Sequence, residues 1–344
     1  MVTITPYEPG APTDALHAIW EATLGTTPSY SLPPGKLHAL LNYPTARVFL
    51  ARTDEIVGWA LTYTIRAGTA VDPSMQHLRG GLSALAVHPS HQRRGVGSAL
   101  HSAAVAYLET AVRASFAAST PRPTEGAIQL GSAFPRIFPG LPEGAPAIDF
   151  FGKRGWTLGE RATDLYGALP SCVDLGQFTA PAEAKGVVFR AATAADADTV
   201  MRMQHAEFGG YCGWPDLFAT FFEAGRAQDI HLALRGGEVI GATLAAVKGS
   251  PAHVRLAWPD TLGELAATQL TPGEACGVIA CVGVSAAARG TGAGVGLTAA
   301  GMVELTRRGA DGVFIDWASM LGFYERFGVQ AWAAPYVTAT RRVT

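Results

Sequence analysis

The sequence predicts a mixed α/β protein built from two domains of the same type. A chain of 344 residues fits about two domains, and 48% apolar against 16% charged residues is enough to bury a core in each. The chain also repeats itself, because a strand, a polar turn and a second strand occur at residues 49–58 and again at 232–241. A glycine-rich segment follows this hairpin in both halves, at residues 87–97 and 284–294.

The first half contains strand-like apolar runs between segments with a helical repeat of apolar residues. We expect helices at 13–24 and 34–41, strands at 47–52, 56–66 and 82–88, a helix over 97–117, a strand at 127–131, a short helix around 150–153 and a last pair of strands over 156–169. The long helix is expected to begin at the glycines, directly after an apolar strand. These elements form the predicted N-terminal domain, residues 1–169.

The second half shows the same order of elements. We expect a strand at 187–190, helices at 194–208 and 216–224, a hairpin over 230–248, a strand at 278–284, a helix from the second glycine segment to about 308, a strand at 312–317, a short helix at 319–327 and a final strand at 331–341. These elements form the predicted C-terminal domain, residues 187–344. The polar segment 170–186 has few strand-forming residues and is predicted to be the linker.

Charge and cysteine content exclude several classes of protein. Lys plus Arg is 26 against 28 for Asp plus Glu, a net charge of −2, which argues against nucleic acid and against a basic membrane surface as partners. The start of the chain does not have the pattern of a secretion signal, and the uncharged stretch 275–288 is too short to cross a bilayer. No C-x-x-C pair occurs among the cysteines, so neither a zinc site nor a disulfide framework is expected. The cysteines are Cys172, Cys212, Cys276 and Cys281. We expect a cytoplasmic protein.

The two glycine segments are the strongest candidates for binding chemistry. Each lies between an apolar strand and a helix, and the first N–H groups of a helix are unpaired and partly positive, which suits a pyrophosphate. Glycine lets the backbone approach phosphate oxygens without a Cβ in the way. The spacing fits neither a P-loop nor the G-x-G-x-x-G turn of nicotinamide-binding domains. A turn that only packs tightly is the alternative, and its occurrence twice at matching positions argues against that alternative.

These segments resemble motif A of the GCN5-related N-acetyltransferases (GNAT), Q/R-x-x-G-x-G/A. The first copy is VHPSHQRRGVGSAL at residues 87–100, and the second is RGTGAG at 289–294. GFYERFG at 322–328 resembles the F-Y-x-x-x-G segment of the family, and FFGKRGW at 150–156 is the same segment with Phe151 in place of the tyrosine. The resemblance covers most of the chain as a tandem pair. It implies two GNAT-like domains, each a mixed, mostly antiparallel sheet flanked by helices, with acetyl-CoA as the cofactor.

The resemblance also implies which main-chain groups bind acetyl-CoA. The strand before each motif would separate from its neighbour at a bulge, so that pantetheine pairs with the strand edge and an N–H group polarises the thioester carbonyl. The strand candidates are Leu85, Ala86 and Val87 in the first copy and Val282, Gly283 and Val284 in the second. The pyrophosphate candidates are Gln92, Arg93, Arg94, Gly95, Val96, Gly97 and Ser98, and then Arg289, Gly290, Thr291, Gly292, Ala293 and Gly294. The three arginines could add charged contacts or be solvated surface charges.

Direct transfer to an amine needs a proton donor for the departing thiolate, and Tyr324 is the catalytic candidate. Its alternative role is that of an aromatic side chain packed in the core. Phe151 cannot donate a proton, so the first copy is either a cofactor-binding pseudo-domain or uses water or Tyr166. No general base is identified, because the strands before both motifs lack a carboxylate. The nearby carboxylates are Glu274, Asp164 and Asp316, each of which is more simply explained as solvated or structural.

The function predicted from the resemblance is acetyl-CoA-dependent N-acetylation of a primary amine on a small molecule. Tandem members of this family include mycothiol synthases and bacterial enzymes that acetylate amino sugars, and residues 134–142 resemble the second kind more closely. The second copy is the better catalytic candidate. The alternatives are a non-catalytic CoA-binding, sensing or interaction protein, a mycothiol-synthase-like enzyme and a protein N-acetyltransferase. No metal site is expected, since His88 and His91 have no histidine counterparts in the second copy, and the oligomeric state is left open.

Overall fold

The computed structural model describes most of the chain, and its elements follow the predicted order. The described residues are 2–26, 30, 32–67, 77–119, 123–169, 174–211, 213–247, 276–318, 320 and 322–344. The strands are β1 (Thr3–Pro6), β2 (Ala46–Arg52), β3 (Ile56–Ala67), β4 (His77–Val87), β5 (Gly126–Leu130), β6 (Leu141–Pro142), β7 (Thr157–Ala168), β8 (Val187–Ala191), β9 (Ile230–Arg235), β10 (Glu238–Ala246), β11 (Cys276–Val284), β12 (Gly312–Ala318) and β13 (Gln330–Val343). The helices are α1 (Asp14–Glu21), α2 (Pro34–Leu41), α3 (Val96–Phe116), α4 (Ala147–Gly152), α5 (Gly176–Glu183), α6 (Ala197–Phe208), α7 (Trp214–Glu223) and α9 (Ala293–Arg307).

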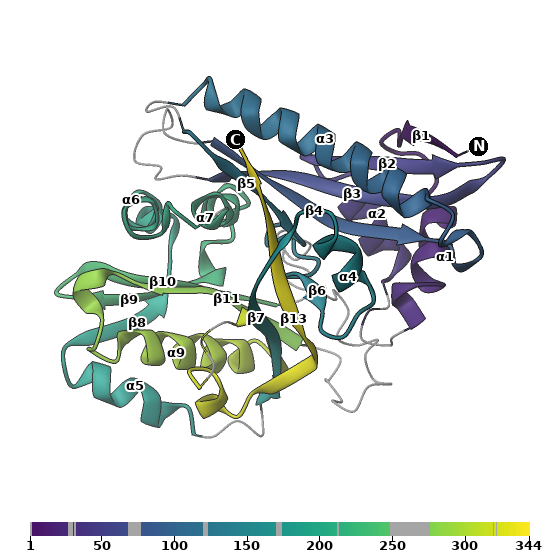
Figure 1. The fold of residues 1–344 in the computed structure, drawn as a ribbon. Helices are drawn as coiled ribbons and strands as arrows, with labels where there is room; N and C mark the ends of the chain where they lie inside the picture. Colours follow the sequence, from purple (N-terminus) through teal and green to yellow (C-terminus); the bar gives the residue numbers. More distant parts are fainter. Residues whose placement is uncertain are drawn as a thin grey trace.

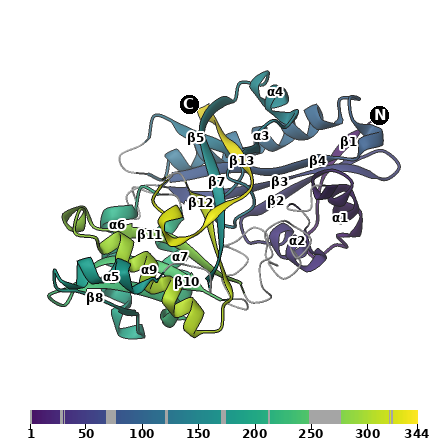
Figure 2. The same cartoon turned by 90° about the horizontal axis from the view of Figure 1, so that it is seen from below.

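The described strands form one mixed sheet that runs through both halves of the chain (Figure 1 and Figure 2). Its order is β1-β2-β3-β4-β5-β13-β7-β12-β11-β10-β9-β8, and β6 pairs with β13. Neighbouring strands are antiparallel except for β4 with β5 and β11 with β12, which are parallel. The mixed, mostly antiparallel sheet predicted from the resemblance is therefore confirmed, with the two sheets joined into one.

The halves are joined because each gives its last strand to the other. The C-terminal strand β13 pairs with β5 of the first half, where Thr340 lies opposite Gln129. Strand β7 of the first half pairs in turn with β12 of the second half, where Leu165 lies opposite Ile315. The domain boundaries at residues 169 and 187 remain a prediction from the sequence repeat, and the central strands of the sheet alternate between the two halves.

Helices cover the sheet with apolar faces that the sequence spacing sets. In α3 the residues that face the sheet recur every fourth position, and Leu100, Ala104, Leu108 and Val112 are fully buried. The corresponding helix of the second half, α9, packs against β9, β10 and β11. Helices α6 and α7 lie on the other side of those strands (Figure 1). Each half thus follows the same plan, with one long glycine-started helix on one face of the sheet and two shorter helices on the other.

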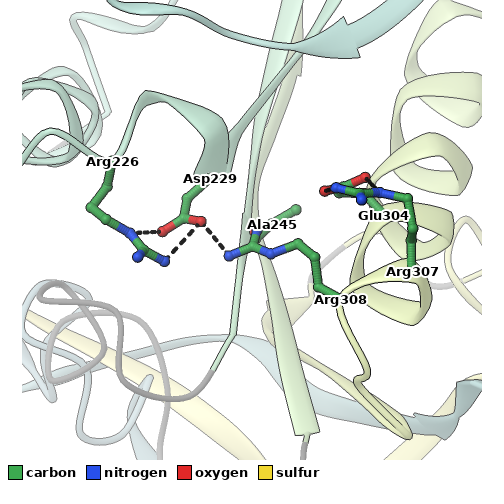
Figure 3. A network of polar contacts seen from close by, with 6 residues as sticks. All are labelled: Arg226, Asp229, Ala245, Glu304, Arg307 and Arg308. Atoms are coloured by element: carbon green, nitrogen blue, oxygen red, sulfur yellow. Dashed lines mark hydrogen bonds and ion pairs between the residues drawn. The ribbon is translucent and has the colours of Figure 1, made fainter.

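A buried polar network fixes the end of α9 (Figure 3). The fully buried carboxylate of Asp229 accepts hydrogen bonds from Arg226, with Nε at 2.9 Å, and from Arg308. Arg308 directly follows α9 and also donates to the carbonyl of Ala245 at 3.0 Å. Glu304 and Arg307 form a second, more exposed pair on the same helix end. These contacts tie the helix to the end of β10 and to the start of β9.

Four details differ from the sequence-based expectations. A pair of strands was expected over 156–169, and the structure has the single long strand β7 there. The predicted linker contains the helix α5, which packs against α9. The short strands β1 and β6 were not predicted, since two to four residues carry too little periodicity to be recognised. Of the short helix expected at 319–327, the described part is a single 3-10 turn, Glu325–Phe327, and Ser319 lies outside the described residues. Within the described chain no helix is both long and apolar enough to cross a membrane.

Candidate active site

The two glycine turns have the same backbone geometry. In each, the strand is followed by a short 3-10 turn, Pro89–His91 or Ala286–Ala288, and then by a glycine that caps the long helix. The caps, Gly95 and Gly292, have φ of 84° and 90°. A left-handed φ strains every residue with a Cβ, which explains the glycine at this position. The predicted repeat is therefore a repeat of local structure as well as of sequence.

The first turn lies at the surface and carries positive charge. Its residues 92–95 are exposed, including the side chains of Arg93 and Arg94. The side-chain amide of Gln92 donates to the carbonyl of Val87 at 2.9 Å, which anchors the turn to the end of β4. Arg154 adds a third cation, because its guanidinium donates to the hydroxyl of Ser98 at 2.7 Å. This turn presents helix N–H groups and cations to the outside, as an anion site requires.

The second turn is partly covered by the segment predicted as a linker. Ala182 of α5 lies 3.8 Å from the position a Cβ would take at Gly292. Lys185, just after α5, donates to the carbonyl of Thr291 at 3.2 Å. Arg289 and Gly290 remain exposed. The linker therefore brings one ammonium group to the second turn, a contribution that the motif spacing does not show.

The predicted separation of strands is confirmed in both halves. Parallel pairing of β4 with β5 stops at Leu82 opposite Leu130, and pairing of β11 with β12 stops at Ile279 opposite Ile315. Beyond these points β4 and β11 continue to the glycine turns without a parallel partner among the described strands. Both strands also carry a register shift against their antiparallel neighbours. At the shift in β11, Cys281 has a φ of 53°, which marks a bulge.

The open end of β11 and β12 leads into a cavity of about 490 Å³. Its walls come from five parts of the chain. The lining residues are Ile279, Ala280, Cys281 and Val282 of β11, Ile315, Asp316, Trp317 and Ala318 of β12, Met320 and Tyr324 after β12, Phe208, Tyr211 and Trp214 at α6 and α7, and Arg79, Gln129, Ala133 and Phe134 of the first half. The cavity therefore lies where the two halves meet, beside β11, the strand that leads to the second glycine turn.

Asp316 is the carboxylate in the cavity wall. Its side chain is 11% exposed, and its Oδ2 accepts a hydrogen bond from the Nε of Arg136 at 2.9 Å. Burial raises the pKa of Asp316 to about 7, with a further contribution from Asp164 and an opposing one from Arg136. A carboxyl group with a pKa near neutrality can exchange protons at physiological pH.

Arg136 and Asp164 hold this carboxylate in place from behind the cavity. Arg136 is fully buried and pairs with both carboxylates, while Asp164 also accepts the N–H of Trp317 at 2.9 Å. One guanidinium thus serves two carboxylates, which leaves one negative charge to be neutralised by a proton or a ligand. Asp164 is fully buried and does not line the cavity, so its role is to position the end of β12.

Tyr324 and Cys281 face the same cavity and remain protonated. Burial raises the pKa of Tyr324, and the charges of Asp316 and Cys281 raise it further, so its hydroxyl keeps its proton. Burial likewise raises the pKa of the Cys281 thiol. A phenol with a proton to give can act as an acid, whereas a thiol held neutral is a poor nucleophile. The cavity therefore combines a proton acceptor, Asp316, with a proton donor.

The other residues proposed from the sequence lie in the cavity wall, in the core of the first half or at the far end of β12. Val282 lines the cavity, and Gly283 lies beneath the ring of Phe208, which would be 2.4 Å from a Cβ at that position. Phe151 is buried in the first half's core. Tyr166 lies in β7, where its hydroxyl would be 2.7 Å from a Cβ on Gly312, at the end of β12 away from the cavity. The carboxylate at position 274, the cysteines at 172 and 212 and the whole 248–275 segment lie outside the described residues.

Four site residues were not singled out by the sequence reasoning. Arg79 and Gln129 of the first half line the cavity, Arg136 pairs with Asp316, and Lys185 reaches the second turn. A single arginine in a strand gives no signal until the neighbouring strands are known. No cluster of three metal-ligating side chains occurs among the residues that the structure describes.

Comparison with known proteins gives a family match to part of the first half and structural matches to the whole chain. The acetyltransferase (GNAT) family matches residues 14–130, which include the first glycine turn. No curated protein matches the sequence. Among solved structures, the GCN5-related glucosamine N-acetyltransferase region of a fungal multi-domain GH3 β-N-acetylglucosaminidase is 26% identical with a TM-score of 0.82. That match covers 99% of this chain, which spans about 38% of the length of the fungal protein.

Two further structures share the fold across the whole chain. A GCN5-related N-acetyltransferase from Sphaerobacter thermophilus is 16% identical with a TM-score of 0.67, and the match covers 99% of this chain and 96% of that one. A tandem GNAT protein from the clavulanic acid biosynthesis pathway is 15% identical with a TM-score of 0.57, covering 100% and 99% of the two chains. At these identities the likeness concerns the fold, and it extends over both halves. Residues 14–130 thus match the acetyltransferase (GNAT) family, and the whole chain has the fold of the tandem GNAT proteins.

Proposed function

We propose that the protein transfers an acetyl group from acetyl-CoA directly to the primary amine of a small molecule, an amino sugar. The observation that carries the proposal is the cavity at the open end of β11 and β12. It brings Asp316 and Tyr324 together beside the strand that leads to the second glycine turn. Binding groups and proton-transfer groups thus lie along one path through the second half.

The residues around the second turn fit coenzyme A. Helix α9 begins at the left-handed Gly292, and its first N–H groups suit a pyrophosphate. Lys185 and Arg289 supply positive charge at the same turn. The edge of β11 from Ala280 to Val284 has no parallel partner in the described sheet and is available to the amides of pantetheine. When bound there, acetyl-CoA supplies the activated acyl group.

The side chains in the cavity divide the proton transfers between them. A primary ammonium has no lone pair, so the acceptor must lose a proton before it attacks, and the ionised Asp316 accepts that proton. Tyr324 holds its proton and donates it to the sulfur as the thioester bond breaks. The neutral thiol of Cys281 lines the cavity without a covalent role, which favours direct transfer over an acetylated enzyme.

The aromatic wall and one relative support an amino sugar as the acceptor. Tyr211, Trp214, Trp317 and Phe134 line the cavity and offer ring faces against which the apolar face of a sugar can pack. The 26%-identical fungal region is described as a glucosamine N-acetyltransferase. We assign the first half the role of a scaffold that completes the cavity, since Phe151 has no proton to donate at the position matching Tyr324.

The test is turnover with defined amines. Purified protein is incubated with acetyl-CoA and a panel of glucosamine, other amino sugars, polyamines and peptides, and both free CoA and the acetylated product are measured. We expect acetylated glucosamine, and a fall in kcat of about 100-fold or more in Tyr324→Phe without loss of acetyl-CoA binding. Tyr107→Phe, a tyrosine on α3 outside the cavity, is the matched control. Acetyl-CoA binding without product from any amine would favour the CoA-sensing alternative.

A further inference from the structure

The cavity wall contains an arginine whose Nε has no hydrogen-bond partner among the described residues. Arg79 of β4 lines the cavity, and its Nε is buried without a hydrogen-bond partner. Among the described residues, no ion pair or hydrogen bond involves its guanidinium. A buried donor that is left unpaired costs about 1–3 kcal/mol, and more for a charged group. An arginine in this position therefore calls for an explanation in terms of a ligand.

The sheet register shows why Arg79 faces the cavity. Gly80 lies opposite Ile128, and a Cβ on Gly80 would be 3.2 Å from Leu108 of α3, so this residue faces the helix. Its neighbours Arg79 and Gly81 face the opposite side, because side chains alternate along a strand. Gly81 lies opposite Gln129, which also lines the cavity. Arg79 and Gln129 thus form one polar wall, contributed entirely by the first half.

The charges in the cavity are arranged asymmetrically. The carboxylate in its wall, Asp316, is already paired with Arg136, which also pairs with Asp164. Arg79 forms no ion pair with Asp316 or with any other described residue that lines the cavity. A ligand that pairs with the polar groups of both walls carries a cationic or neutral amine at Asp316 and negatively charged oxygens at Arg79.

We infer that the acceptor is an amine that also carries an anionic oxygen group, a phosphate or a carboxylate, which Arg79 and Gln129 bind while the amine lies at Asp316. The guanidinium fork matches the geometry of both groups, and the amide of Gln129 adds neutral donors. This inference rests on the proposed function and narrows its substrate class. It also assigns a separate role to each half of the tandem chain, since the first half would recognise the acceptor that the second half acetylates.

The test compares three acceptors of one ring type on the intact protein. These are glucosamine, glucosamine 6-phosphate and muramic acid, which carry no anion, a phosphate and a carboxylate. The variants are Arg79→Gln, Arg79→Lys and, as the matched control, Arg66→Gln, an exposed arginine on the neighbouring strand β3 outside the cavity. kcat and KM are measured for each pair of protein and acceptor.

We expect the unaltered protein to favour one of the anionic acceptors over glucosamine in kcat/KM by about 10-fold or more. Arg79→Gln should raise KM for that acceptor by about 10- to 100-fold, as expected for the loss of a hydrogen bond to a charged group. The same change should leave glucosamine nearly unaffected, Arg79→Lys should keep part of the preference, and Arg66→Gln should behave like the unaltered protein. The acceptor that shows the effect identifies the anion as phosphate or carboxylate.

Two results would overturn the inference while leaving the proposed function intact. One is that glucosamine is acetylated as efficiently as both anionic acceptors. The other is that Arg79→Gln lowers kcat/KM equally for all three, which would make the arginine a structural residue. If the Gln variant does not fold, the ranking of acceptors and the Lys variant decide. If no amine of any kind is acetylated, the proposed function fails, and this inference fails with it.

Discussion

Replacing Asp316 with Asn tests the general base and the origin of its pKa together. Asn keeps the size of the side chain and an oxygen for Arg136, but it cannot accept the proton of the amine. The burial that raises the pKa of Asp316 to about 7 sets the size of the pH effect. With that pKa, about a tenth of the carboxylate is ionised at pH 6 and about nine tenths at pH 8. We therefore expect kcat to rise by about tenfold between pH 6 and pH 8 in the unaltered protein.

The assay is kcat at saturating amine and acetyl-CoA across pH 6 to 9, with release of free CoA as the signal. kcat reports groups in the complex with bound substrates, which separates Asp316 from the titration of the free amine. At pH 8 the Asp316→Asn variant should lose about 100- to 10,000-fold in kcat, the usual worth of a positioned base. Its remaining activity should lack the rise between pH 6 and 8. No falling limb is expected below pH 10, because Tyr324 keeps its proton.

A stability measurement separates this loss from misfolding. The pKa of Asp316 is raised from 3.8 to about 7 on folding, so its contribution to stability is lost as the pH rises between these two values. The whole of this loss is present at pH 8, and Asn should therefore not lower the free energy of unfolding there. Asp149→Asn, an exposed carboxylate on α4, is the matched control and should change neither property. A folded Asp316→Asn variant with unaltered kcat and the same pH profile would refute the assignment of the base.

Two further predictions concern stability. Asp229→Asn removes the buried carboxylate that Arg226 and Arg308 share in Figure 3, and it should lower the free energy of unfolding by about 2–4 kcal/mol, measured by urea denaturation at pH 7; a change below 1 kcal/mol would show that solvent already screens both arginines. His101 accepts the indole N–H of Trp156 at 2.9 Å, and burial, followed by two nearby arginines, lowers its pKa to about 4. Since the unfolded histidine titrates near 6.5, the unfolded chain binds the proton first, and His101 should cost about 3 kcal/mol of stability as the pH falls from 6.5 to 4. His101→Phe should remove this part of the pH dependence, and an identical pH profile in the variant would contradict the lowered pKa.

The glycine turns could be predicted because their cause is local. A left-handed cap demands glycine wherever it occurs, so Gly95 and Gly292 are visible in the sequence as a spacing. The bulge and the separated strands followed from the resemblance to the family. The same local reasoning located Tyr324 through its motif. Features that depend on a single segment of the chain could therefore be predicted from the sequence.

The rest depends on which strands become neighbours, and the sequence does not encode that locally. Both β7 and β13 have the pattern of a buried strand, and nothing in either one states that it pairs within the other half. That exchange brings Arg136 of the first half against Asp316 of the second and buries the carboxylate, and this burial raises the pKa of Asp316 against the opposing effect of Arg136. Without knowledge of this strand exchange, the sequence predicts only an ordinary residue at the end of a strand for Asp316 and a solvated surface charge for Arg79.

The central claim is that acetyl transfer takes place at the second glycine turn and not at the first. Asp substituted at Gly294 or at Gly97 places a negative charge at the start of α9 or of α3, where it would repel a pyrophosphate. The most direct measurement is acetyl transfer to glucosamine by these two variants, with acetyl-CoA binding followed by calorimetry in the same preparations. We expect Gly294→Asp to lose both binding at its turn and transfer, and Gly97→Asp to keep transfer. Transfer that survives Gly294→Asp and disappears in Gly97→Asp would contradict the claim.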